Sequence, residues 1–285
     1  MKWEGNRESD NVEDRRGGGG LVGGTGLGIG TIVLAILGWA VFGVNPLTTI
    51  GVLNQGQAVV QRQPQAKAPP ANDTTARFVS TVLADTEDVW TDIFRQAGST
   101  YVKPRLVLYS GSTPTACGTG QAAMGPFYCP QDQKVYLDLD FFNTLKNQLG
   151  AGGEFAEAYV IAHEVGHHVQ NLMGISDQVD AARSRGSERQ ANALSVRLEL
   201  QADCFAGVWA NHADQARHIL EQGDIESAVN AAGRIGDDTL QKQSQGYVVP
   251  DSFTHGSSAQ RVRWFTTGFK SGTVQSCDTF NAQTL

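Results

Sequence analysis

The sequence predicts a mostly helical α+β domain with a small sheet, preceded by one membrane-spanning helix. Apolar residues recur at helical spacing over most of residues 73–285, and two short runs near the middle are typical of strands. One stretch near the N-terminus carries no charge at all. These features divide the chain into a cytoplasmic tail (residues 1–20), a transmembrane helix (21–44), a flexible linker (45–72) and one folded domain (73–285).

The elements of the folded domain follow from this periodicity. Helices are predicted over residues 74–96, 154–172, 187–213 and 224–236, and a last helix is expected to start after His255 and to run through Trp264. The two predicted strands cover residues 105–109 and 134–139. Helices dominate and a small sheet lies near the middle of the chain, which is typical of an α+β domain.

Residues 21–44 are about long enough to cross a bilayer as a helix. A cleavable signal peptide would have a shorter apolar core, and a buried core helix would seldom begin in a glycine-rich run. We therefore expect an uncleaved single span. Arg15 and Arg16 precede it, whereas the first basic residue beyond it is Arg62. Because Lys and Arg stay on the cytoplasmic side, the N-terminus should be inside and the folded domain outside.

Composition and cysteine spacing narrow the possible functions. The formal net charge is −7, which argues against a nucleic-acid partner because such proteins need a basic surface. The four cysteines lack the two-residue spacing of a zinc ribbon or a redox motif. In an exported domain they are expected to form two disulfides, Cys117 with Cys129 and Cys204 with Cys277. Four buried, reduced thiols are the alternative.

The segment His163-Glu164-Val165-Gly166-His167 is an HExxH motif inside a predicted helix. Residues four apart share a helix face, so His163 and His167 can direct imidazole nitrogens at one Zn²⁺ ion. Glu164 is then placed to act as general base toward a water molecule that the zinc activates. Two polar surface residues on an ordinary helix are the plainer interpretation. The apolar flanks predict burial instead, where a carboxylate beside two imidazoles needs a metal.

A catalytic zinc site usually has a third protein ligand, and Glu199 is the candidate. It lies in the second long predicted helix, with Asp203 one turn later on the same face. Asp203 could accept a hydrogen bond from the outer nitrogen of a zinc-bound histidine. The alternative role for Glu199 is a surface ion pair with Arg197. His168 is a rival ligand, but on an ideal helix it points about 100° away from His167.

The segment Thr254-His255-Gly256-Ser257-Ser258 precedes the last predicted helix, which Ser257 or Ser258 would cap. We expect His255 to donate a hydrogen bond to the oxyanion that forms during attack on a carbonyl group.

Arg261 or Arg263, further along the same helix, could hold a nearby carboxylate or carbonyl. A loop histidine and surface arginines without a role in the reaction are the alternative.

Several longer runs carry a family resemblance: KWEGNRESDNVEDRRG, YCPQDQKVYLDLDFF, HEVGHHVQ, LELQADCFAGVWA and HGSSAQRVRWF. Over nearly its whole length the chain resembles the bacterial neutral zinc metallopeptidases of the YpfJ type. The resemblance implies a zincin-like, gluzincin-like catalytic domain whose ligands are His163, His167 and Glu199. It also supports His255 as a transition-state stabiliser. The predicted location is the bacterial inner membrane, with the catalytic domain in the periplasm or outside the cell.

The predicted function is that of a membrane-anchored, zinc-dependent peptidase acting on proteins or peptides. A strand such as residues 134–139 is suited to pair with an extended substrate. One alternative keeps the zinc chemistry and takes cell-wall peptides as the substrate of an amidase. Another is a non-enzymatic, membrane-tethered adaptor stabilised by zinc. Glu164 argues against the adaptor, because a structural site has no use for a general base beside its ligands.

Overall fold

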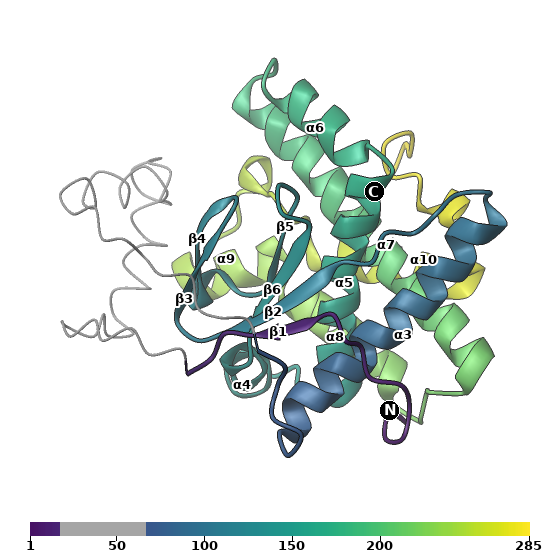
Figure 1. The fold of residues 1–285 in the computed structure, drawn as a ribbon. Helices are drawn as coiled ribbons and strands as arrows, with labels where there is room; N and C mark the ends of the chain where they lie inside the picture. Colours follow the sequence, from purple (N-terminus) through teal and green to yellow (C-terminus); the bar gives the residue numbers. More distant parts are fainter. Residues whose placement is uncertain (18–66) are drawn as a thin grey trace.

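In the computed structural model, which describes residues 1–17 and 67–285, a small sheet lies against a larger group of helices (Figure 1). The helices are α3 (Thr74–Gln96), α4 (Asp140–Asn147), α5 (Glu154–Leu172), α6 (Ile175–Arg183), α7 (Glu188–Arg217), α8 (Asp224–Arg234), α9 (Asp237–Gln245) and α10 (Ser258–Ser271). The strands are β1 (Val12–Asp14), β2 (Arg105–Tyr109), β3 (Ser112–Thr115), β4 (Gly118–Gln121), β5 (Phe127–Cys129) and β6 (Lys134–Asp138). The α+β prediction is therefore confirmed.

The main sheet has the strand order β1-β2-β6-β5. β1, β2 and β6 are parallel, and β5 runs antiparallel to β6. β6 thus has a neighbour on both sides. Its backbone groups are already used, so the expectation that residues 134–139 pair with an extended substrate is wrong. Among the described strands of this sheet, β5 and β1 form the edges. β3 and β4 make a separate two-stranded hairpin.

The sheet buries both of its faces. Leu106 and Leu108 of β2 belong to the large core shared with the helices, whereas Val107 and Tyr109 pack in a second cluster with Tyr136 of β6. Successive side chains of a strand point to opposite faces, so one short strand serves both clusters. This explains why β2 reads as an unbroken apolar run and not as an alternating one.

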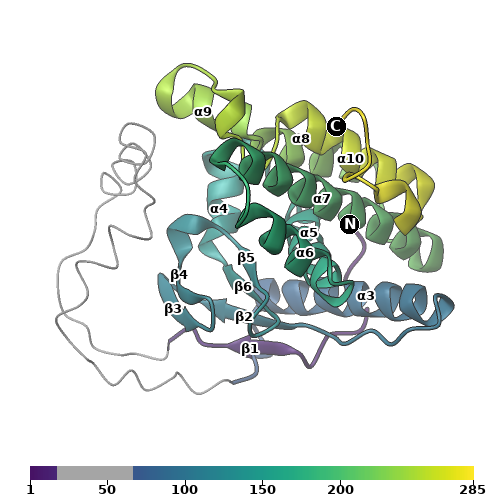
Figure 2. The same ribbon diagram turned by 90° about the horizontal axis from the view of Figure 1, so that it is seen from above.

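The helices that carry the HExxH motif and Glu199 approach their neighbours closely. α7 packs against both α5 and α10, and α3 packs against α5 and α7 (Figure 2). Gly207 of α7 faces the backbone of Phe265, and Gly268 of α10 faces the backbone of Cys204. A Cβ at either glycine would collide with these backbone atoms. The two glycines therefore set how near α10 comes to α7, and with it the position of every side chain that α10 presents to the site.

The N-terminal residues are part of this fold. β1 pairs with β2 over Val12–Asp14, and the Trp3 side chain is buried in the main core. The prediction of a separate tail over residues 1–20 and of a domain that begins at residue 73 is therefore corrected: residues 1–17 belong to the folded unit. Three consecutive strand residues at the end of a charged segment gave no periodic signal.

The predicted transmembrane helix (21–44) and most of the predicted linker (45–72) lie outside the described residues. Among the helices that the structure does describe, none is long and apolar enough to span a bilayer.

Both predicted disulfides are present. Cys117–Cys129 joins the turn of the β3–β4 hairpin to β5, and Cys204–Cys277 joins α7 to the C-terminal segment. All four cysteines are paired, so the alternative of buried free thiols is wrong.

Candidate metal centre

α5 carries the HExxH residues into the middle of the molecule. Its side chains at His163 and Glu164 are each 7% exposed. The small residue of the motif, Gly166, faces α7: a Cβ there would lie 3.0 Å from the carbonyl oxygen of Ala202. Glycine at this position therefore lets α7 approach the face of α5 that holds the histidines.

That approach brings Glu199 of α7 to the two histidines. Glu199 Oε2 lies 3.2 Å from His163 Nε2, and Glu199 Oε1 lies 3.5 Å from His167 Nε2. The two Nε2 atoms are 3.2 Å apart. One ligand atom from each of the three residues falls within 4.8 Å of the others, as a shared metal ion requires. The structure thus places the three predicted ligands together.

The outer nitrogen of each ring is already used. His163 Nδ1 lies 2.9 Å from Asp203 Oδ1, and His167 Nδ1 lies 2.9 Å from Gln170 Oε1. Gln170 uses its amide nitrogen toward Leu198 O, so its oxygen is the atom that faces His167. Both Nδ1 atoms therefore donate, and both Nε2 atoms of the neutral rings are left as acceptors.

Four acceptor atoms consequently converge on one point: two Nε2 atoms and the two oxygens of Glu199. Lone pairs directed at one another are unfavourable unless a cation lies between them. Two imidazoles and one carboxylate, with outer hydrogen bonds that fix the ring tautomers, are the donor set of a catalytic zinc site. The residues present fit Zn²⁺.

The pKa values at the centre have the same origin. Burial alone would raise the pKa of Glu199, but His167 and His163 hold it well below its usual range. Burial would likewise lower the pKa of His163, yet Asp203 and Glu199 raise it to about 10. Both directions mean that the ligands favour a positive charge between them, which is a proton on His163 when no metal is bound and the metal ion when it is.

Asp203 lies at the middle of the network behind His163. Arg261 of α10 binds it with two hydrogen bonds of 2.9 Å, and the Tyr159 hydroxyl also donates to it. Burial would raise the pKa of Asp203, but Arg261 and His163 lower it to about 2. The carboxylate is therefore ionised and can fix the tautomer of His163. Arg261, one of two arginines expected near the site, fills this role, whereas Arg263 donates at 3.4 Å to the C-terminal Leu285 carbonyl.

Glu164 follows the ligand His163 directly on α5, and the charges of all three ligand residues act on its carboxyl group. Burial raises its pKa, while His163 and His167 oppose that shift and Glu199 adds to it.

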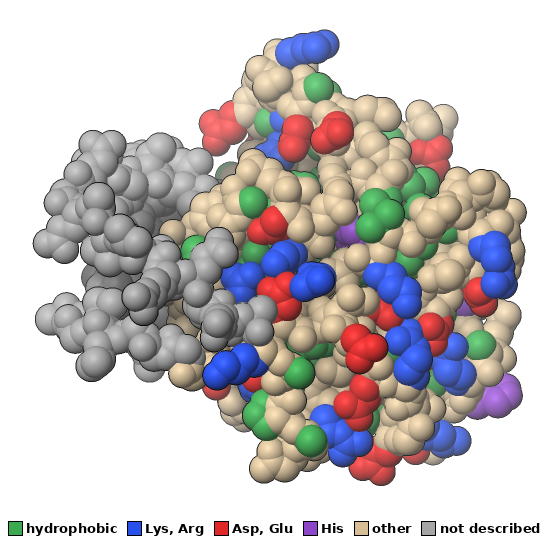
Figure 3. Space-filling model, in the orientation of Figure 1, with side chains coloured by type: hydrophobic (Ala, Val, Ile, Leu, Met, Phe, Trp, Pro, Cys, Tyr) green, Lys and Arg blue, Asp and Glu red, His purple; other side chains and the backbone are tan. Residues whose placement is uncertain are grey.

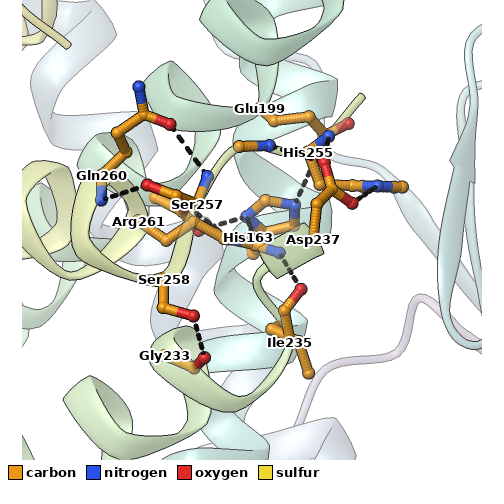
Figure 4. Close-up of polar contacts among 12 residues, drawn as sticks. His163, Glu199, Gly233, Ile235, Asp237, His255, Ser257, Ser258, Gln260 and Arg261 are labelled. Carbon is orange, nitrogen blue, oxygen red and sulfur yellow. Dashed lines mark hydrogen bonds and ion pairs between the residues drawn. The ribbon is translucent and has the colours of Figure 1, made fainter. Parts of the chain in front are cut away.

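His255 approaches from the loop before α10 and lies near Glu199 (Figure 4). Its side chain is 53% exposed, and its Nδ1 lies 3.2 Å from Asp237 Oδ1. Asp237 Oδ2 accepts from three successive backbone amides, those of Thr254, His255 and Gly256. Burial would lower the pKa of His255, but the hydrogen bond to Asp237 and the charge of Glu199 raise it. Asp237 thus fixes both the loop and the ring.

Three residues of the site were not singled out from the sequence: Tyr159, Gln170 and Asp237. The first two could have been found, because they lie four positions before His163 and three after His167, on the helix face that carries the ligands. Asp237 is distant in sequence and gives no local signal. His168 is outside the centre: it is fully buried, and its ring contacts Val102 O and the Tyr128 hydroxyl.

Comparison of the sequence with known proteins identifies the family to which the chain belongs. Residues 1–280 match the model of the family described as "Putative neutral zinc metallopeptidase". The chain belongs to this family. It is 52% identical to "Uncharacterized protein YpfJ" of Escherichia coli (strain K12) over 286 residues, which cover 98% of this chain and 99% of that protein.

A more distant relative is "Uncharacterized protein Mb2605" of Mycobacterium bovis, 42% identical over 219 residues that cover 73% of each chain. No solved structure matches. The predicted resemblance is confirmed. At the level of the family the chain is a zinc metallopeptidase, and the family name implies Zn²⁺ as its metal.

Proposed function

We propose that this protein hydrolyses peptide bonds of protein or peptide substrates, with Zn²⁺ held by His163, His167 and Glu199. The observation that supports the proposal is the convergence of four acceptor atoms. Two are Glu199 oxygens, and two are the Nε2 atoms of imidazole rings whose tautomers are fixed by hydrogen bonds at Nδ1. When bound there, zinc supplies Lewis-acid activation of a water molecule and of the substrate carbonyl.

Glu164 acts as general base in this proposal. It follows His163 directly on α5 and is 7% exposed, so bulk water has little access to its carboxylate. Glu164 takes a proton from the attacking water and then delivers it to the leaving amine, which completes the cleavage of the C–N bond.

His255 stabilises the negative charge that develops on the carbonyl oxygen. The ring is held by Asp237, which favours its protonated form, so a ring N–H is available to donate to the oxygen. Asp237 acts through His255 and is a positioning residue.

The substrate would lie in extended form along β5. This strand is the edge of the sheet nearest α5, and Tyr128 in it contacts His168 and Asn171 of that helix. An edge strand offers unpaired backbone groups to an extended peptide. Membrane association through residues 21–44 remains part of the proposal, because their lack of charge is independent of the rest of the fold.

The proposal is tested by incubating the full-length protein with a cell-envelope extract and mapping new peptide N-termini by mass spectrometry. The control is Glu164→Gln at equal zinc content, which keeps the ligands and removes the base. New protein termini found only with the unmodified protein support a peptidase and give its preference. Cleavage confined to cell-wall peptides would replace the proposal by an amidase. Equal results with both proteins and intact zinc would favour the adaptor.

A further inference from the structure

The first seventeen residues are held by the rest of the chain along their whole length. Lys2 N donates to Ile219 O at 2.8 Å, and Ser9 N donates to Ser80 O at 3.0 Å. The Trp3 ring meets Phe78 edge to face at 5.5 Å, and its Nε1 donates to Glu154 at the start of α5. These contacts reach three different helices or their flanks.

A buried carboxylate of α3 depends on this segment. Glu87 is 1% exposed and accepts hydrogen bonds from Ser9 (2.6 Å), Asn11 (2.7 Å) and Arg7 (3.0 Å). Lys103 is its remaining ion-pair partner. Removing one side of a buried charge cluster is strongly destabilising, because the other side keeps its desolvation penalty. α3 is therefore built to be covered by residues 7–11.

The two ends of the segment that joins the described parts also meet. Asp14 N donates to Lys67 O at 2.6 Å, and Lys67 N donates to Asp14 O at 3.4 Å. Arg16 pairs with Asp14 and with Asp73, the N-cap of α3. The first described part therefore ends, and the second begins, at the same place in the folded unit.

From this closure we infer that residues 1–17 and 67–285 lie on the same side of any membrane that the chain meets. A single crossing between them would put β1 and β2 on opposite sides of about 30 Å of hydrocarbon, and their backbone hydrogen bonds could not form. The expected topology, with residues 1–20 in the cytoplasm and the domain outside, is incompatible with the pairing.

The basic residues of the N-terminal segment, among them the Arg15 and Arg16 that indicated a cytoplasmic N-terminus, have another explanation in the fold. Arg7 pairs with Glu87 and Asp88, Arg15 with Glu13, and Arg16 with Asp14 and Asp73. Acidic and basic side chains are interspersed over the face where β1 and α3 lie (Figure 3). These arginines are thus required to neutralise their carboxylate partners, and they give no independent evidence for the orientation of the chain across a membrane.

Accessibility labelling in whole cells tests the inference. Glu4 and Ser99 are exposed, one in each described part, and all four native cysteines are paired. Glu4→Cys and Ser99→Cys are made separately in the full-length chain and treated with a membrane-impermeant maleimide before and after lysis. Labelling of both in intact cells, or of both only after lysis, is the expected result. Labelling of one in intact cells and of the other only after lysis would overturn the inference.

A disulfide crosslink tests directly whether Asp14 and Lys67 lie side by side. Asp14 and Lys67 exchange backbone hydrogen bonds as an antiparallel pair, whose Cα separation of about 5.5 Å suits a disulfide. The double variant Asp14→Cys/Lys67→Cys should crosslink on mild oxidation of membranes from cells that express the full-length chain. The matched control Glu4→Cys/Lys67→Cys should not crosslink. Absence of the crosslink in the first variant, with both single variants folded, would contradict the pairing.

Discussion

Two groups of buried charges are completed in different ways. Around Glu13 and Glu87 the chain supplies its own cations, so each carboxylate is neutralised by Arg or Lys. At the candidate metal centre the cation Arg261 forms an ion pair with Asp203, on the far side of His163 from the centre. The ligand atoms that face the centre are all acceptors. Function is therefore expected at the cluster whose charges the protein does not balance by itself.

Removing the proposed zinc ligand Glu199 should have the largest effect on zinc binding and activity. Glu199→Ala takes away two of the four converging acceptors and leaves two histidines, one fewer than the three ligands of a catalytic zinc. We expect zinc to be lost on dialysis and peptidase activity to be abolished. Metal content by mass spectrometry and cleavage of a protein substrate measure both. Glu188→Ala, an exposed carboxylate at the start of the same helix, should keep zinc and activity.

Removing Trp3 tests the self-balanced region. Trp3→Ala deletes a 6%-exposed ring that packs on Phe78, so the free energy of unfolding should fall by about 3–5 kcal/mol. Denaturant titration of the full-length chain measures the loss. The exposed neighbour Glu4, changed to Ala, should alter stability by less than about 0.5 kcal/mol. An unchanged midpoint for Trp3→Ala would show that the N-terminal segment does not stabilise the domain.

His255 separates metal binding from catalysis within the open cluster. His255→Ala should lower kcat by roughly 10²–10³-fold, the loss typical of one oxyanion donor, while zinc content stays at the wild-type level. Steady-state kinetics with a protein substrate and metal analysis are compared with His218→Asn, which changes an exposed histidine at the end of α7. Loss of zinc from the His255 variant would instead make this residue part of the metal site.

The smallest expected effect is on pH dependence. Burial would raise the pKa of Glu13, but hydrogen bonds from Arg105, Lys134 and Arg15 lower it to about 2. A carboxylate whose pKa is lower in the folded state stabilises the fold above its unfolded pKa, and this contribution is lost as the pH falls. The free energy of unfolding should therefore decrease between about pH 4.5 and pH 2. Glu13→Gln should be less stable at pH 7 and should lose less over that range; parallel titrations would contradict the assignment.

The parts of the fold that the sequence predicts are those governed by local periodicity. Residues 74–96 and 154–172 form helices with the predicted bounds, because their apolar faces repeat within the segment itself. The same periodicity places His163 and His167 on one face and predicts the helix of Glu199. α4, α6 and α9 have only eight or nine residues each, so the apolar period has little length over which to repeat.

What could not be predicted depends on contacts between distant residues. β1 has three residues and is stabilised by pairing with a strand more than ninety residues away. Asp237, the first residue of α9, reaches His255 because α9 packs against α10. No spacing in the sequence predicts that contact. The sequence also could not show that β6 is an interior strand, since sheet order follows from packing and not from composition.

The most direct measurement of the central claim is X-ray absorption at the zinc edge of the purified full-length protein, combined with metal counting. We expect one zinc per chain, with two imidazole nitrogens and carboxylate oxygen in its coordination, and the same spectrum for Glu164→Gln. Glu199→Ala should lose the signal. Zinc that is absent from the unmodified protein, or that survives in Glu199→Ala with unchanged coordination, would contradict a metal centre at His163, His167 and Glu199.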